Sequence, residues 1–99
     1  MDAITSETVP RPSRDAAWQV VGGELIVLDA RGSKLRGLNA TGGRVWSLMD
    51  GRLRVAEIAR AIAAATRAPE DVVLLDVIQF LSRLHALGLV EVGPLPEEP

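Results

Sequence analysis

The side chains that could do chemistry in this sequence are few and scattered. His85 is the only histidine, and the chain has no cysteine. A zinc site needs three or four ligands of these kinds, so His85 lacks the partners to form one. Glu70, Asp71 and Asp76 fall within one predicted helix, whose first turn favours negative charge in any case. The sequence therefore predicts no metal site.

Two further arrangements that carry chemistry are incomplete. Ser47 and Ser82 have no base nearby in the sequence that could activate a hydroxyl nucleophile. Gly42-Gly43 precedes a predicted helix, but the Lys-Ser/Thr pair of a phosphate-binding loop does not follow it. We therefore expect no catalytic centre and no cofactor, and a protein that is not an enzyme.

The charge of the chain argues against nucleic acid as a partner. Eleven Lys and Arg residues stand against thirteen Asp and Glu residues, for a formal net charge of -2. A nucleic-acid binder of this size is usually basic, because neutralising phosphates supplies most of its affinity. The third predicted helix offers Arg83 and Gln79 against Glu70, Asp71 and Asp76, which is the wrong sign for a recognition helix.

Length and composition indicate one compact domain. The chain has 99 residues, of which 47% are hydrophobic and only 3% aromatic, so the core must be built from aliphatic side chains. No apolar run approaches the roughly 18 residues that span a bilayer. Residues 1–13 carry acids and prolines where a signal peptide would be basic and then apolar. We expect a soluble cytoplasmic protein that does not bind membranes.

The first half of the sequence has the pattern of β-strands. Trp18–Val21 and Glu24–Asp29 are separated by Gly22-Gly23, a hairpin signal. A turn at residues 30–33 leads to Lys34–Leu38, in which polar and apolar residues alternate. This alternation predicts a half-exposed third strand, with Leu35 and Gly37 on one face and Lys34, Arg36 and Leu38 on the other.

The second half has helical periodicity. A short helix, capped by Asn39 or Thr41, ends at Asp50-Gly51. A second runs from about 55 to 65, although Arg54 stands where a capping Ser or Thr is favoured. A third runs from Pro69 to Leu87 and ends at Gly88, and residues 89–92 form a short final strand.

Three strands followed by three helices predict an α+β fold. Two short helices, a longer helix and a strand are also the plan of a winged helix. The polar, proline-containing residues 1–16 are predicted to be a flexible arm, and the Pro- and Glu-rich residues 93–99 a flexible tail. The folded domain is then expected to span residues 17–92.

The third predicted helix has a wide apolar arc. A stripe at helical spacing is predicted to face the core, and it consists of Val73, Val77, Phe80, Leu84 and Leu87. Leu74, Leu75 and Ile78 lie outside this stripe. Two interpretations are open: the helix is wholly buried between the strands and the other helices, or the extra residues form one wall of a groove for a partner.

Several short motifs, taken together, resemble those of the PqqD family, whose members are also called RiPP recognition elements. The match covers roughly Trp18 to Val92. Its motifs are, in order, Gly23–Asp29, Leu38–Gly42, Val45–Gly51, Val55–Ala59, Asp76-Val77, Phe80-Leu81, Leu84 and Gly88–Val90. Each motif is short, and the specificity lies in their order and spacing.

The resemblance implies a three-stranded antiparallel sheet packed on three helices. It also implies that the protein binds the leader of a ribosomally made precursor peptide as an added strand beside the third strand and against the third helix. The precursor would then be delivered to a modifying enzyme, such as a radical SAM or a cyclising enzyme. The strand residues placed in this site are Lys34, Leu35, Arg36, Gly37 and Leu38. The helical periodicity of the third predicted helix adds Leu74, Leu75, Ile78, Gln79 and Ser82.

The chemistry of an edge strand agrees with this expectation. Its unpaired N–H and C=O groups can be satisfied by a partner strand. Lys34 and Arg36 are either solvated charges or charges that hinder self-association and attract an acidic peptide. A winged-helix DNA-binding regulator and a structural subunit of a modifying enzyme are the alternative functions, and the protein could be a monomer or a dimer.

Overall fold

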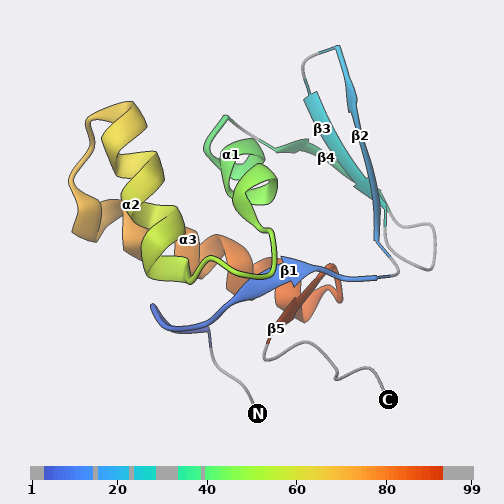
Figure 1. Cartoon of the computed structure of the whole chain (residues 1–99). Helices are drawn as coiled ribbons and strands as arrows, with labels where there is room; N and C mark the ends of the chain where they lie inside the picture. The colour runs from blue at the N-terminus through green and yellow to red at the C-terminus, as the bar shows by residue number, and fades with distance from the viewer. Residues whose placement is uncertain (1–3, 15, 23, 29–33, 39, 93–99) are drawn as a thin grey trace.

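The computed structural model describes residues 4–14, 16–22, 24–28, 34–38 and 40–92; the predicted tail, 93–99, lies outside them. The elements are β1 (Pro10–Pro12), β2 (Ala17–Val21), β3 (Glu24–Leu28), β4 (Lys34–Leu38), α1 (Ala40–Leu48), α2 (Val55–Thr66), α3 (Glu70–Ala86) and β5 (Val90–Val92). Within the described residues the fold is therefore α+β, with three helices and small antiparallel sheets (Figure 1). None of these helices has the length and apolar character needed to cross a membrane.

Strands β2, β3 and β4 form an antiparallel sheet in that order. The turn between β2 and β3 contains Gly22 at a φ of +59°, a left-handed conformation that glycine adopts without steric cost. Trp18 stands opposite Val27, so the two residues share one face of the sheet. This face packs against α1, where the Trp18 ring meets the Trp46 ring edge to face, with 5.5 Å between centroids.

The pairing of β3 with β4 contains a bulge. Its register shifts between Leu25 and Val27, so that the two residues Arg36-Gly37 of β4 stand against Ile26 alone. A bulge of this kind increases the local twist and leaves one residue outside the regular ladder. The bulge lies on β4, which forms one edge of its sheet in the described part of the chain.

The bulge corrects the strict alternation predicted for β4. That alternation assigned Leu35 and Leu38 to opposite faces of the strand. In the structure they stand across from Val27 and Leu25, two residues that share one face of β3 and are both buried in the core. The extra residue between them breaks the strict alternation along the backbone of β4.

A second sheet corrects the prediction of a flexible arm over residues 1–16. Strand β1 pairs antiparallel with β5, with Arg11 opposite Glu91 (Figure 1). The Arg11 guanidinium lies 3.3 Å from the Glu91 carboxylate, and the Ser13 N–H donates to the Leu89 carbonyl at 2.9 Å. Proline lacks a backbone N–H, but it is tolerated in a short edge strand because the N–H groups on the open side of such a strand make no hydrogen bonds within the sheet. Of the predicted arm, the described residues 4–14 are thus packed against the domain.

The same segment caps α2. The first N–H groups of a helix have no partner within it. Here the Val55 N–H donates to the Thr8 carbonyl at 2.8 Å, and the Ala56 N–H donates to the Ser6 carbonyl at 2.9 Å. The side chain of Ile4, just before this turn, is only 7% exposed and belongs to the core.

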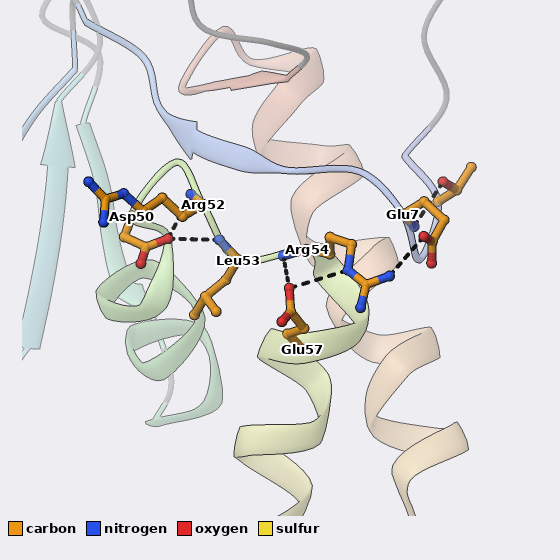
Figure 2. Close-up of polar contacts among 7 residues, drawn as sticks. Glu7, Asp50, Arg52, Leu53, Arg54 and Glu57 are labelled. Carbon is orange, nitrogen blue, oxygen red and sulfur yellow. Dashed lines mark hydrogen bonds and ion pairs between the residues drawn. The ribbon is translucent and has the colours of Figure 1, made fainter.

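Charged side chains complete the start of α2 and compensate for the missing Ser or Thr cap. Glu57 Oε1 accepts the Arg54 N–H at 2.9 Å and lies 3.3 Å from Arg54 Nε (Figure 2). Arg54 Nη1 donates to Glu7 Oε1 at 2.9 Å. Arginine has no acceptor, so only the glutamate half of a capping box forms here. The predicted start of α2 near residue 55 is confirmed.

Helix α3 faces the core with a stripe close to the predicted one. Val73, Val77, Leu81 and Leu84 are buried, while Leu87 is 51% exposed. Phe80 is only partly buried and packs against the edge of the core. The buried stripe is rotated slightly from the predicted one, toward Leu81. Gly88 ends the helix as predicted, at a φ of +78°, with its N–H donating to the His85 carbonyl.

The docking of the N-terminal segment makes a testable prediction. Ile4→Ala removes a buried aliphatic side chain and should lower the free energy of unfolding by about 2–4 kcal/mol, measured by urea denaturation. Val72→Ala is the matched control: Val72 is 52% exposed on α3, and its truncation should change stability by about 0.5 kcal/mol or less. Equal effects of the two substitutions would contradict the docked arrangement.

Candidate functional site

Three carboxylates with shifted pKa values are candidates for chemistry: Asp50, Glu57 and Glu91. The backbone N–H of Leu53, followed by that of Arg52, holds the pKa of Asp50 below its usual range, through hydrogen bonds of 2.9 and 2.8 Å (Figure 2). This carboxylate closes the turn after α1. The Arg54 N–H lowers the pKa of Glu57 in the same way, at the start of α2. Both groups are therefore accounted for by local structure.

Glu91 has a similar structural role in the β1–β5 sheet. The Arg14 N–H, at 3.0 Å from Glu91 Oε2, is the main reason that the pKa of this carboxyl is lowered, and the Ser13 hydroxyl and Arg11 add to the effect. Among the described residues there is no group of three or more His, Cys, Asp or Glu side chains that could hold a metal ion. The three carboxylates thus stabilise a turn, a helix start and a pair of strands.

The backbone of β4 offers a different kind of site. On one side β4 pairs with β3, and no other described strand pairs with its second side. A strand edge of this kind presents N–H and C=O groups that can accept a further strand. The two described strands outside this sheet, β1 and β5, pair with each other instead. The strand edge predicted from the sequence is therefore open in the described part of the chain.

The helix residues predicted for the site differ in exposure. Leu75 is 57% exposed, and Gln79 and Ser82 are also exposed, all on the face of α3 turned away from the core. Leu74 and Ile78 are half-buried and pack against the edge of the core. A wholly buried α3, one of the two interpretations left open by the sequence, is therefore excluded.

The two halves of the predicted site meet the same helix. Both β4 and α3 pack against α1 (Figure 1). The side chains of Lys34–Leu38 lie outside what the structure describes, so this half of the site is defined by its backbone. Each half thus contacts α1, and the grouping of the two halves into a single site stays a prediction.

Three features of β2 and α1 were not predicted from the sequence. Trp18 of β2 is 52% exposed yet contacts the buried Trp46 of α1. The indole Nε1 of Trp46 is buried without a hydrogen-bond acceptor among the described residues. Arg44, also on α1, is exposed. No sequence pattern pairs these two tryptophans, and the sequence shows only that aromatic residues are scarce.

A small α+β domain with an open sheet edge is typical of a module that binds another polypeptide. Comparison with known families shows the family to which this module belongs. The model of the family described as "Coenzyme PQQ synthesis protein D (PqqD)" matches residues 24–90. The chain belongs to the PqqD family, which confirms the resemblance found from its motifs. No curated protein matches the chain.

Two solved structures are similar over most of the chain. One is described as TbiB1 in complex with the TbiA(beta) leader peptide; it is 29% identical, with a TM-score of 0.74, over 82% of this chain and 94% of that one. The other is the solution structure of the PqqD truncation of Methylobacterium extorquens PqqCD, described as a functional, stand-alone RiPP recognition element. It is 22% identical, with a TM-score of 0.78, over 90% of this chain and 95% of that one. The second likeness supports the fold.

The lowered carboxyl pKa values predict loss of stability in acid. Asp50, Glu57 and Glu91 have folded pKa values below their ordinary ones, so in acid the unfolded chain binds more protons. Their contribution to stability is present above the unfolded carboxyl pKa of about 4 and is lost as the pH falls through the folded values.

Thermal denaturation at a series of pH values measures this effect. The melting temperature should hold near neutral pH and fall below about pH 4. In Asp50→Asn, the side-chain oxygen still accepts hydrogen bonds but no longer titrates, so the acid-induced fall should be smaller than in the parent. An identical pH profile for the two proteins would show that Asp50 makes no contribution.

Proposed function

We propose that this protein is a non-catalytic domain that binds the leader of a ribosomally made precursor peptide and presents it to a modifying enzyme. The open edge of β4 is the observation that carries this proposal. Membership of the PqqD family supports it, and so does the similarity to TbiB1, which was solved with a leader peptide. The comparisons support neither a DNA-binding regulator nor a structural subunit.

In the proposed complex, the leader adds as a strand beside β4 and against α3. Main-chain hydrogen bonds to Lys34–Leu38 supply affinity that does not depend on sequence, as in other strand additions. Leu75 and Ile78 offer apolar surface to leader side chains, with Leu74 behind them and Gln79 and Ser82 as polar contacts. An interface below about 1,200 Å² fits such a peptide, and micromolar binding, roughly −8 kcal/mol, is the scale we expect.

The wider context follows from this proposal. The partner enzyme is of the radical SAM or cyclising type, and neither nucleic acid nor membrane takes part. Because the precursor is made on ribosomes, we place the encounter in the cytoplasm. The order of α1, α2, α3 and β5 makes the arrangement winged-helix-like, with the surface of α3 used for a peptide in place of a DNA groove.

Amide chemical shifts provide the first test. Titrating isotope-labelled protein with the leader of a precursor peptide encoded beside this gene should shift the amides of Lys34–Leu38 and of α3. Gly37→Pro removes a backbone donor within the bulge and should abolish these shifts, provided that its spectrum shows a folded protein. Shifts confined to β2, the other edge of the sheet, would place the site elsewhere.

Two leucines of similar exposure test the helix half of the site. Leu75→Glu places a charge where the proposed leader packs, and should weaken leader binding by about tenfold or more, measured by calorimetry. Leu87→Glu is the matched control, since Leu87 is also exposed on the C-terminal end of α3 and lies outside the proposed site. Equal affinities for the two variants would remove α3 from the site.

A further inference from the structure

The charges of this chain are segregated along its sequence. Between Asp29 and Asp50 every charged residue is basic: Arg31, Lys34, Arg36 and Arg44. Of the eleven Lys and Arg residues, four are in this stretch, which leaves seven elsewhere to oppose all thirteen Asp and Glu residues. We refer to residues 30–49 as the basic segment. A protein with a net charge of -2 thus contains a stretch with no acidic residue at all.

The basic segment includes the two elements that border the open strand edge. Strand β4 supplies the edge, and α1 packs beside it (Figure 1). Arg44 is exposed on α1. By contrast, the exposed start of α3 carries the acidic residues Glu70 and Asp71. The part of the sequence without acidic residues is therefore the part that contains the open strand β4 and the helix packed beside it.

We infer that the segment that binds at β4 is acidic and that the positive charges of the basic segment attract it. This inference rests on the proposed function and specifies the chemistry of the leader. Charges of one sign around a binding edge attract a partner of the opposite sign, and they act mainly on the rate of association. Because exposed charges are screened over about 8 Å at physiological salt, the effect weakens as salt is added.

A peptide fits these features better than another polyanion does. Nucleic-acid binding of useful strength commonly involves about 6–10 phosphate contacts, which exceeds the four charges of the basic segment. The backbone groups along β4 are matched by another polypeptide strand, whose N–H and C=O groups alternate at the same spacing. An acidic peptide uses both the edge and the charge.

The composition of the leader is the first test. In the precursor encoded beside this gene, Asp and Glu should outnumber Lys and Arg; a neutral or basic leader would overturn the inference at once. The second test compares this leader with a copy in which Asn and Gln replace Asp and Glu. The copy should bind roughly tenfold more weakly at low salt, and the difference should shrink at high salt.

The two proposals fail in different ways in this comparison. Equal binding of both peptides would leave strand addition intact and overturn the acidic leader. No binding of either peptide would overturn the proposed function and this inference with it. Displacement of the leader by a single-stranded oligonucleotide of equal charge would assign the basic segment to nucleic acid and count against an acidic peptide partner.

A pair of arginine variants tests the protein side. Arg44→Glu reverses an exposed charge on α1, the helix that contacts β4, and should weaken leader binding several-fold at low salt, with a slower association rate. Arg60→Glu changes the net charge equally, but Arg60 lies on α2, outside the basic segment, where it makes an exposed ion pair of 3.8 Å with Glu70. Equal effects of the two variants would show that total charge, and not the basic segment, governs binding.

Discussion

Backbone hydrogen bonding is the constraint on which the rest of this structure depends. A helix start and a strand edge both leave N–H and C=O groups without partners, and such groups are costly when they are removed from water. The N-terminal segment supplies partners at two places: the carbonyls of Ser6 and Thr8 at the start of α2, and strand β1 along β5. It does not cover β4. The backbone groups of this segment are therefore committed elsewhere.

The bulge in β4 disfavours pairing of the open edge with a second copy of the chain. A long, regular edge is a template for pairing with a second copy of the same strand. Arg36-Gly37 interrupts the ladder after the pair formed by Leu35, so the regular part of the edge is short. A symmetric pairing of two such edges would bring two bulges and two sets of basic residues together. A flexible peptide can adjust its own backbone to the bulge, whereas a second rigid sheet cannot do so at low cost.

The sequence predicted the elements well and their partners less well. Strands at 18–21, 24–29 and 34–38 and all three helices were found because local periodicity and the glycines at 22, 51 and 88 mark them. The β1–β5 sheet was missed because two prolines in three residues suggested an arm, and because its ladder joins residues some eighty positions apart. The bulge was missed for a related reason: one extra residue changes the face of every later side chain without changing the polarity pattern.

The arrangement also suggests why a domain of this kind can release what it binds. Strand β4 is held in place by β3 and α1 before any peptide arrives, so most of the ordering upon binding falls on the peptide. In the proposed complex, that ordering cost would offset much of the gain from main-chain hydrogen bonds and from a small apolar contact at Leu75 and Ile78. A preformed edge, a short ladder and an unstructured partner would then give the modest affinity that we propose. A precursor held in this way can dissociate after modification, whereas an interface with a deep apolar core would retain it.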